Sequence, residues 1–118
     1  VNSDDPKLIL EAINRALLPI QKEFGGETFA FVMKLEKSGI CTYNGLIERA
    51  TLLSIDGKTT VNLQTYGSIL GKSDSFIGEN LYFRMKDGDN LILLTDGAAN
   101  QDADDDQTSI IISKNFQS

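Results

Sequence analysis

The chain has 118 residues, a formal net charge of −6, no histidine, no tryptophan and a single cysteine, Cys41. The absence of histidine excludes serine–histidine and cysteine–histidine nucleophile systems, and it excludes histidine-containing zinc sites. One cysteine excludes an all-cysteine metal site and a disulfide within the chain. The acidic balance, 17 Asp and Glu against 11 Lys and Arg, argues against a nucleic-acid groove, which needs a basic field. Two classes remain: carboxylate chemistry with a hard cation, and a binding module without chemistry.

The length is that of one domain with one hydrophobic core, so we predict a single domain over residues 1–118. The longest apolar runs, residues 91–94 and 110–112, are far shorter than the roughly 20 residues that span a bilayer. The first five residues lack the basic and apolar regions of a signal peptide. Together with a lone cysteine, these features predict a cytoplasmic protein with no membrane partner.

The first segment predicts one helix. Asp5 is a suitable N-cap, Pro6 suits the first helical position, and Gly25-Gly26 closes the segment. Pro19 is expected to kink or end the helix, because proline lacks a donor and clashes with the preceding turn. Apolar residues at helical spacing predict the buried face of this helix: Leu8, Ile9, Ala12, Ile13, Ala16, Leu17, Ile20 and Phe24.

The rest of the chain predicts strands separated by turns. Asp56-Gly57 and Asp87-Gly88 are turn signals, and Cys41 is interpreted as a small buried hydrophobe. The order of elements, one helix followed by a mostly antiparallel meander, predicts an α+β fold whose helix covers one face of the sheet. The predicted strands are residues 28–35, 40–46, 50–55, 59–63, 80–85, 90–95 and 109–113.

Two acidic points could carry chemistry. Asp96-Gly97 directly follows an apolar run, so a strand would fix the carboxylate and the glycine would let the backbone approach an ion. Residues 102–106 contain four aspartates and directly precede the last strand, so the two points converge if these strands are neighbours. Crowded carboxylates repel one another unless a cation lies among them, and oxygen ligands favour Mg²⁺ or Mn²⁺ over zinc. The alternative interpretation is a solvated acidic loop beside an ordinary Asp-Gly turn.

Residues 88–97, G-D-N-L-I-L-L-T-D-G, resemble the "G-D-x-L-L-L-x-T/S-D-G" segment of the metal-dependent serine/threonine protein phosphatases. This is the PPM or 2C-type family, with its bacterial sporulation stage II E branch. Residues 105–112, D-D-Q-T-S-I-I-I, resemble that family's closing "D-D/N-x-T/S-V-x-V" strand. The resemblance spans most of the chain and corresponds to the family's C-terminal half. Weaker matches occur in the same order at residues 5–14, 28–32, 43–50 and 66–71.

The resemblance implies a phosphatase 2C-like layered sandwich, here partial, with one N-terminal helix packed on a mostly antiparallel sheet. It implies a binuclear Mg²⁺ or Mn²⁺ site in which a metal-bridging water attacks the phosphoryl group. Asp96 and Gly97 match the family's metal-binding "D-G", and Asp105 matches the aspartate of the closing strand. Asp104 or Asp106 would replace Asp105 if the register shifts by one residue. The implied partner is a phosphoserine or phosphothreonine protein of bacterial signalling, or a regulatory protein.

The chain departs from the family in its first half. The family's bridging Asp-Gly motif has no counterpart, because Asp56-Gly57 and Asp87-Gly88 fall in predicted turns. Arg49 does not match a phosphate ligand and is interpreted as a surface strand residue. The chain therefore holds part of a metal site, and we expect weak binding of a divalent ion.

Three hypotheses remain: an active phosphatase domain, a catalytically silent phosphatase-like binding or regulatory module, and an acidic β-rich scaffold with an accidental resemblance. A sheet with no helix packed on it would favour the scaffold. A partial fold would expose an apolar face or a strand edge. This exposure predicts a homodimer, or a complementing N-terminal fragment.

Overall fold

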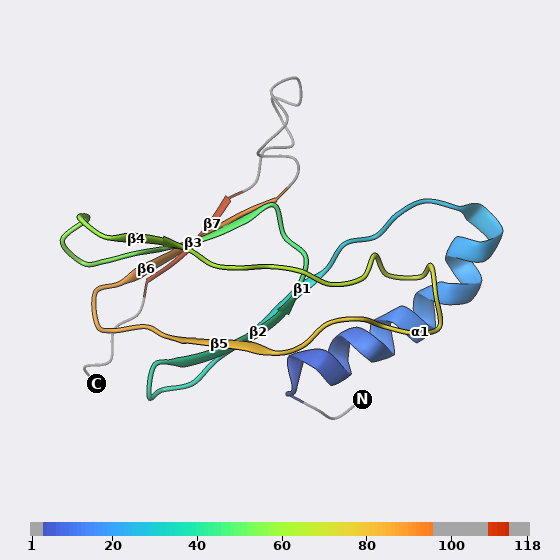
Figure 1. The fold of residues 1–118 in the computed structure, drawn as a ribbon, viewed down its shortest axis with the longest axis horizontal. Coiled ribbons are helices and arrows are strands. Elements are labelled where there is room, and N and C mark those ends of the chain that lie inside the picture. Colours follow the sequence, from blue (N-terminus) through green and yellow to red (C-terminus); the bar gives the residue numbers. More distant parts are fainter. Residues whose placement is uncertain (1–3, 96–108, 114–118) are drawn as a thin grey trace, which may run out of the picture. The chain divides into compact units, whose positions relative to one another are not determined.

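The computed structural model describes residues 4–95 and 109–113, and this part of the chain contains one helix followed by seven strands (Figure 1). This is the α+β content that the sequence predicts. The strands form a three-stranded sheet in the order β1-β2-β5 and a four-stranded sheet in the order β4-β3-β6-β7. The elements are α1 (Pro6–Phe24), β1 (Phe31–Leu35), β2 (Ile40–Gly45), β3 (Arg49–Leu53), β4 (Thr60–Asn62), β5 (Leu81–Arg84), β6 (Asn90–Leu94) and β7 (Ser109–Ser113).

Each predicted strand segment overlaps one observed strand, but the expectation of one meandering sheet was wrong. Turn signals identify only the pairs joined by short turns, β1–β2 and β3–β4. The other pairings join strands that are distant in the sequence.

The chain leaves the first sheet at Gly45, the last residue of β2. Gly45 has a φ of 110°, and a Cβ there would overlap the carbonyl oxygen of Ala30. Only glycine therefore fits where the chain leaves the first sheet. The chain divides into two compact units, one around each sheet.

The first unit contains α1, which packs against β1 and β2. The helix begins and ends as predicted: the Asp5 side chain accepts a hydrogen bond from Lys7 N at 3.0 Å, and Gly25 caps the C-terminus with a φ of 76°. Pro19 does not end the helix, which continues to Phe24, and the ribbon changes direction in its last turns (Figure 1). A bend of this kind relieves the clash between the proline ring and the carbonyl one turn earlier.

The buried face of α1 differs from the predicted face. Leu10, Asn14 and Gln21 are among its buried side chains, and two of these three are polar. The prediction followed apolar residues alone, so it could not find a face that is partly built from amides. Four residues of the predicted face are exposed: Leu8, Ala16, Ile20 and Phe24.

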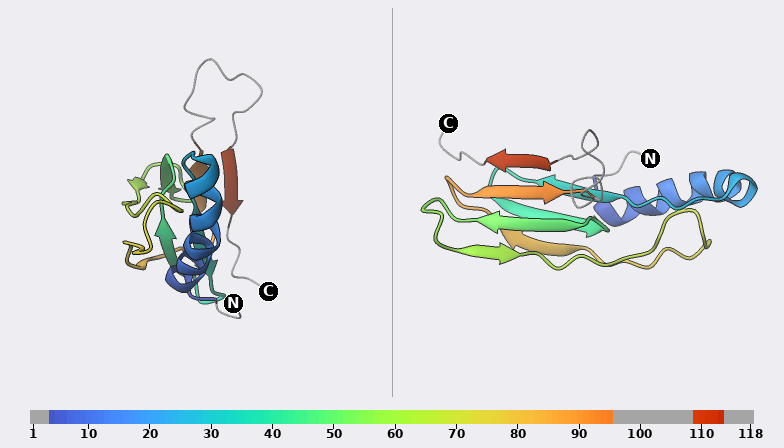
Figure 2. Two further views of the ribbon diagram at one scale, coloured as in Figure 1. Left: turned by 90° about the vertical axis from the view of Figure 1, so that its right-hand side faces the viewer. Right: turned by 90° about the horizontal axis from the view of Figure 1, so that it is seen from above.

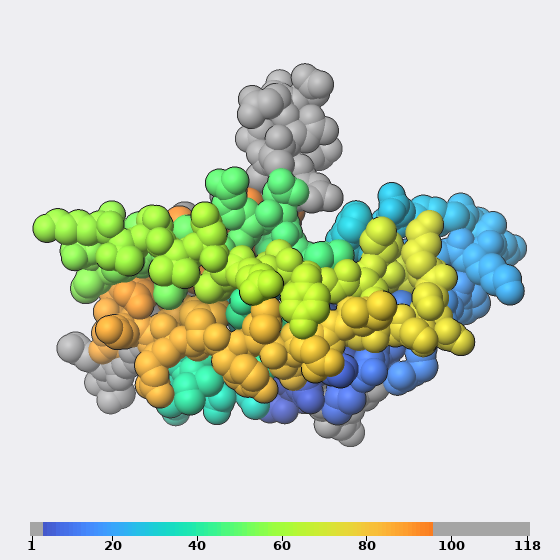
Figure 3. Space-filling model, in the orientation of Figure 1, coloured from blue at the N-terminus to red at the C-terminus, as the bar shows by residue number. Residues whose placement is uncertain are grey.

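Asn14 ties α1 to the segment that precedes β5. Its Oδ1 accepts a hydrogen bond from Gly71 N at 2.7 Å, and its Nδ2 donates to Ser73 O at 2.8 Å. Gly71 has a φ of 78°, and a Cβ there would lie 2.8 Å from Gln21 Cγ. The segment therefore approaches the helix through a glycine, and in Figure 3 its yellow atoms lie against the blue atoms of α1. Both polar groups of a buried amide are thereby satisfied.

Besides its buried amides and Thr42, the core of the first unit consists of apolar side chains. Cys41 is fully buried, as the sequence predicts. The Tyr43 ring lies 5.7 Å from that of Phe31 and 5.8 Å from that of Phe83, centroid to centroid. These are distances at which aromatic rings attract beyond their burial. Burial also raises the pKa of the Tyr43 hydroxyl.

The second unit contains the four-stranded sheet, whose strands lie side by side in the right-hand view of Figure 2. β3 and β6 are its central pair, and Ala50 lies opposite Leu93 while Leu52 lies opposite Leu91. Ala50, Leu91 and Leu93 are buried, so one face of this sheet forms the core of the unit.

Replacement of Asn14 by alanine should destabilise the chain by about 2 kcal/mol, because the buried N–H of Gly71 and the carbonyl of Ser73 lose their partner. The measurement is urea unfolding followed by far-UV circular dichroism. Arg15→Ala, on the exposed side of the same helix, is the matched control and should change stability by less than about 0.5 kcal/mol. Equal losses in the two variants would contradict a specific role of Asn14.

Candidate functional site

The predicted metal ligands Asp96, Gly97, Asp104, Asp105 and Asp106 lie outside the described residues. The structure does describe the two strands that flank them in the sequence. β6 ends at Leu94, two residues before Asp96, and β7 begins at Ser109, four residues after Asp105. The geometry of this candidate site is therefore set by where these two strand ends lie.

β6 and β7 are antiparallel neighbours, and Leu94 pairs with Ser109. The condition for a meeting of the two acidic points, that the strand of the nineties and the last strand are neighbours, is thus met. Because the pairing runs from Leu94–Ser109 to Asn90–Ser113, the chain leaves β6 and enters β7 at the same end of the four-stranded sheet.

A tight turn before β6 fixes its opposite end. Asp89 is buried, and its Oδ2 accepts a hydrogen bond from Lys86 N at 2.9 Å. Asp89 N donates to Lys86 O at 3.0 Å, which closes the turn on both sides. The Gly-Asp pair that opens the phosphatase-like motif therefore has a structural role here. It sets the start of the strand whose other end leads to Asp96.

Arg49 marks the same end of the sheet on the other neighbour of β6. It begins β3 and pairs with Leu94. Its side chain is exposed, so the interpretation of Arg49 as a surface strand residue is confirmed.

The described residues contain no other cluster of carboxylates that could serve as a metal site. Within residues 4–95 and 109–113, no group of three or more Cys, Asp or Glu side chains could hold a metal ion. Asp56-Gly57 lies in the turn between β3 and β4, as predicted, and Asp56 Oδ1 accepts hydrogen bonds from Ser54 Oγ at 2.6 Å and Lys58 N at 2.9 Å. The hydrogen bond from Ser54, followed by that from Lys58, lowers the Asp56 pKa. Asp56 therefore serves its own hairpin.

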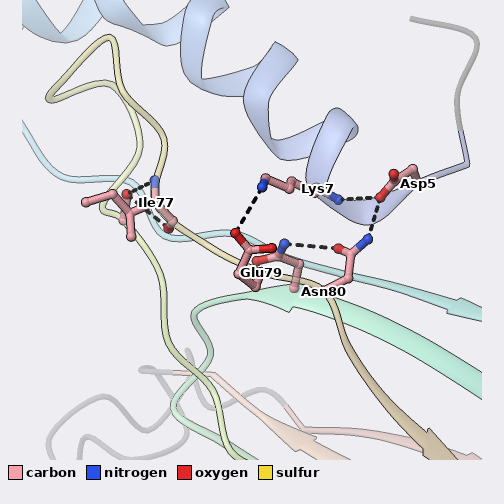
Figure 4. Close-up of polar contacts among 7 residues, drawn as sticks. Asp5, Lys7, Ile77, Glu79 and Asn80 are labelled. Carbon is pink, nitrogen blue, oxygen red and sulfur yellow. Dashed lines mark hydrogen bonds and ion pairs between the residues drawn. The ribbon is translucent and has the colours of Figure 1, made fainter.

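A second polar cluster lies in the first unit (Figure 4). Asp5 Oδ1 accepts from Asn80 Nδ2 at 2.6 Å as well as from Lys7 N, and Asn80 Oδ1 accepts from Asn44 Nδ2 at 3.0 Å. Lys7 Nζ lies 3.1 Å from Glu79 Oε1. The sequence analysis did not identify Asn44 or Asn80. The available signal was a polar amide within a strand, at Asn44, or directly before one, at Asn80. Since Asp5 caps α1, this cluster joins the start of the helix to β2 and the approach to β5.

The ion pairs of the first unit are exposed. Lys34 Nζ lies 3.0 Å from Asp4 Oδ2, and the hydrogen bond from Lys34 lowers the Asp4 pKa and raises that of Lys34. The hydrogen bond to Glu79 likewise raises the Lys7 pKa. Exposed pairs of this kind contribute little to stability. The cluster is therefore a helix anchor, and its titrating groups lack the burial typical of a catalytic pair.

No protein-family profile matches the chain, and no curated protein matches it. Among solved structures, the chain is similar to the phosphatase domain of the cell fate determinant SpoIIE from Bacillus subtilis, with a TM-score of 0.57 and 14% sequence identity. The match covers 100% of this chain and 75% of that one, which is more than the C-terminal half inferred from the motifs. At this identity the likeness establishes a relation of fold. No helix in the described residues is long and apolar enough to cross a membrane.

Replacement of Lys34 by methionine should raise the Asp4 pKa toward its ordinary value, measured by NMR titration of the Asp4 carboxyl. Because the folded-state pKa is lowered, the contribution of the pair to stability is complete above the ordinary aspartate pKa. That contribution is lost as the pH falls through the lowered value. Lys37→Met, another exposed lysine, is the control and should leave the titration unchanged. An Asp4 titration that does not respond to Lys34→Met would contradict the pairing.

Proposed function

We propose that residues 1–118 form a single, partial phosphatase 2C-like domain that hydrolyses phosphoserine or phosphothreonine in partner proteins of bacterial signalling, in the cytoplasm. The pairing of β6 with β7 carries this proposal, because it supports a meeting of Asp96 and Asp105 at one end of a sheet. The fold likeness to the SpoIIE phosphatase domain supports the same function.

Chain length limits how far these carboxylates can lie from the paired strand ends. Directly opposite residues of an antiparallel pair have Cα atoms about 4.5–5.5 Å apart. Asp96 is two residues beyond Leu94, so its Cα lies within about 7 Å of that residue. Asp105 is four residues before Ser109, so its Cα lies within about 14 Å of Ser109. These limits allow both side chains to reach one ion beyond this end of the sheet.

The donor set fits a hard divalent cation. When bound, Mg²⁺ or Mn²⁺ would neutralise charge on the phosphoryl oxygens and supply a water of lowered pKa. Asp96 would hold the ion from the end of β6, with Gly97 allowing the backbone to approach closely. Asp105 would hold it from the approach to β7, or Asp104 or Asp106 in a register shifted by one residue. Since the described residues add no further carboxylate cluster, we expect weak binding.

The second candidate is a catalytically silent phosphatase-like module that binds a partner or regulates one. The observation that favours it is the use of Asp56, which is held by Ser54 and Lys58 within its own turn. This Asp-Gly pair therefore cannot replace the family's bridging motif. The third hypothesis, an accidental scaffold, loses its main support because α1 does pack on β1 and β2.

The chain should hydrolyse p-nitrophenyl phosphate in the presence of Mn²⁺, and Asp96→Ala should lower the rate by at least about tenfold. Asp56→Ala is the matched control, because it removes the aspartate of another Asp-Gly pair that lies in a turn. Activity equal in the chain and in Asp96→Ala would contradict catalysis by this chain and favour the silent module.

Mn²⁺ binding should have a dissociation constant of about 0.1–1 mM, in the range of weak oxygen-ligand sites. The measurement is loss of the free Mn²⁺ signal in electron paramagnetic resonance, which does not depend on turnover. Asp96→Asn and Asp105→Asn should each weaken binding, whereas Asp56→Asn should not. Binding that survives both substitutions would place the ion elsewhere and contradict the proposed ligands.

A further inference from the structure

A small pocket lies where α1 begins, beside the strands of the three-stranded sheet. Its volume is about 290 Å³, and all the residues that line it belong to the first unit. The start of α1, the strands β1 and β2, and the beginning of β5 each contribute side chains. The polar and aromatic residues of the lining are Asp4, Asp5, Lys34, Thr42, Asn80 and Tyr82.

Strand register brings three of these side chains to one face of the sheet. Thr42 in β2 lies directly opposite Lys34 in β1, so both side chains project to the same side. Tyr82 projects to this side as well, because the next residue, Phe83, contacts the Tyr43 ring on the other side. The sheet therefore supplies a hydroxyl, an ammonium group and an aromatic ring to one pocket.

Thr42 is the most buried polar side chain of the pocket. The residue is only 8% exposed, and among the described residues its hydroxyl has no hydrogen-bond partner. Buried polar groups normally have partners, because burial without one costs free energy. The Thr42 hydroxyl is therefore available to a group that enters the pocket.

Carboxylates outnumber cations around the pocket. The hydrogen bond to Asp4 makes the largest contribution to the raised pKa of Lys34, and the charges of Glu36 and Asp5 raise that pKa further. Three carboxylates thus act on one ammonium group, which leaves an excess of negative charge. Such a field favours a positively charged group from solution.

One side of the pocket is held in place, whereas the other side can open. Asp5 and Asn80 are joined by a hydrogen bond of 2.6 Å, which also ties them to the start of α1 (Figure 4). The ion pair between Lys34 and Asp4 is exposed, with side-chain exposures of 38% and 81%. An exposed pair contributes little to stability, so a second cation can displace Lys34 from Asp4 at low cost.

We propose that this pocket binds the side chain of an arginine that a partner protein presents. A guanidinium group is permanently charged and planar, and it has several N–H donors and no acceptor. Asp4 and the Thr42 hydroxyl would accept from these donors, while the ring of Tyr82, which is 67% exposed, would lie against the plane. The inference goes beyond the proposed phosphatase activity and does not depend on it or on a metal.

Titration of the ¹⁵N-labelled chain with N-acetyl-arginine amide, followed by NMR, tests the pocket with an isolated side chain. The amide signals of Lys34, Thr42 and Tyr82 should shift together and saturate. The dissociation constant should be about 1–10 mM, because the ligand is small and the pocket is open to solvent. No saturable shift at these residues would overturn the proposal.

Three further ligands identify the chemistry that the pocket recognises. N-acetyl-citrulline amide has the shape of the arginine compound without its charge, and it should bind at least about tenfold more weakly. The corresponding lysine compound should also bind more weakly, because an ammonium group cannot stack on Tyr82 as a plane. Equal affinity for either compound would contradict the assignment to arginine, as would saturable binding of inorganic phosphate at the same residues.

Variants assign the contacts. Thr42→Val and Asp4→Asn should each raise the dissociation constant at least about threefold, because each removes an acceptor for the guanidinium group. Asp74→Asn, at an exposed aspartate of the same unit, is the matched control and should leave the affinity unchanged. Affinity that survives both Thr42→Val and Asp4→Asn would overturn the proposal.

The stability of Thr42→Val separates a binding role from a structural one. Because the hydroxyl has no partner among the described residues, its replacement by a methyl group should leave the midpoint of urea unfolding unchanged or raise it. A lowered midpoint would show that the hydroxyl already serves the fold, and it would contradict a hydroxyl that is available to a ligand.

Discussion

The four-stranded sheet depends on the backbone pairing of β6 with two strands that are distant from it in the sequence. β6 pairs with β3 on one side and β7 on the other, and its buried leucines form the core of the second unit. Strand register is fixed by which face is buried, because a shift of one residue would turn Leu91 and Leu93 to the other face. The same register decides that Leu94 and Ser109 are opposite each other. The burial of Leu91 and Leu93 within β6 therefore decides which residues lie at the strand end where the candidate site is expected.

The first unit is organised differently, because hydrogen bonds between amides hold its parts together. Asn14 binds the backbone at Gly71 and Ser73, and Asn80 links the cap of α1 to Asn44 in β2. Such contacts are directional, and a buried amide is costly when it is left without partners. They specify how the helix and the segment before β5 meet, whereas the aromatic and aliphatic residues supply most of the burial.

Local signals in the sequence predicted local structure well. Asp5, Pro6 and Gly25 marked the ends of the helix, and Asp56-Gly57 marked a hairpin. The division into two sheets could not be predicted in the same way. β3 and β6 are far apart in the sequence, so no turn motif connects them and indicates that they pair. The buried face of α1 was missed because Asn14 and Gln21 occupy positions that an apolar pattern leaves out. For the candidate site, the motif supplied Asp96 and Asp105, and the structure added the strand pairing that supports their convergence.

The buried Asn14 has a consequence for how α1 is seated. The helix is apolar over a wide arc, so apolar contact alone defines its rotation about its own axis only loosely. Asn14 fits only one rotation, because its oxygen must reach Gly71 N while its nitrogen reaches Ser73 O. The amide therefore fixes the rotational setting of the helix by direction, which apolar contact does not do. An apolar residue of the same size at position 14 would leave the helix free to populate more than one setting.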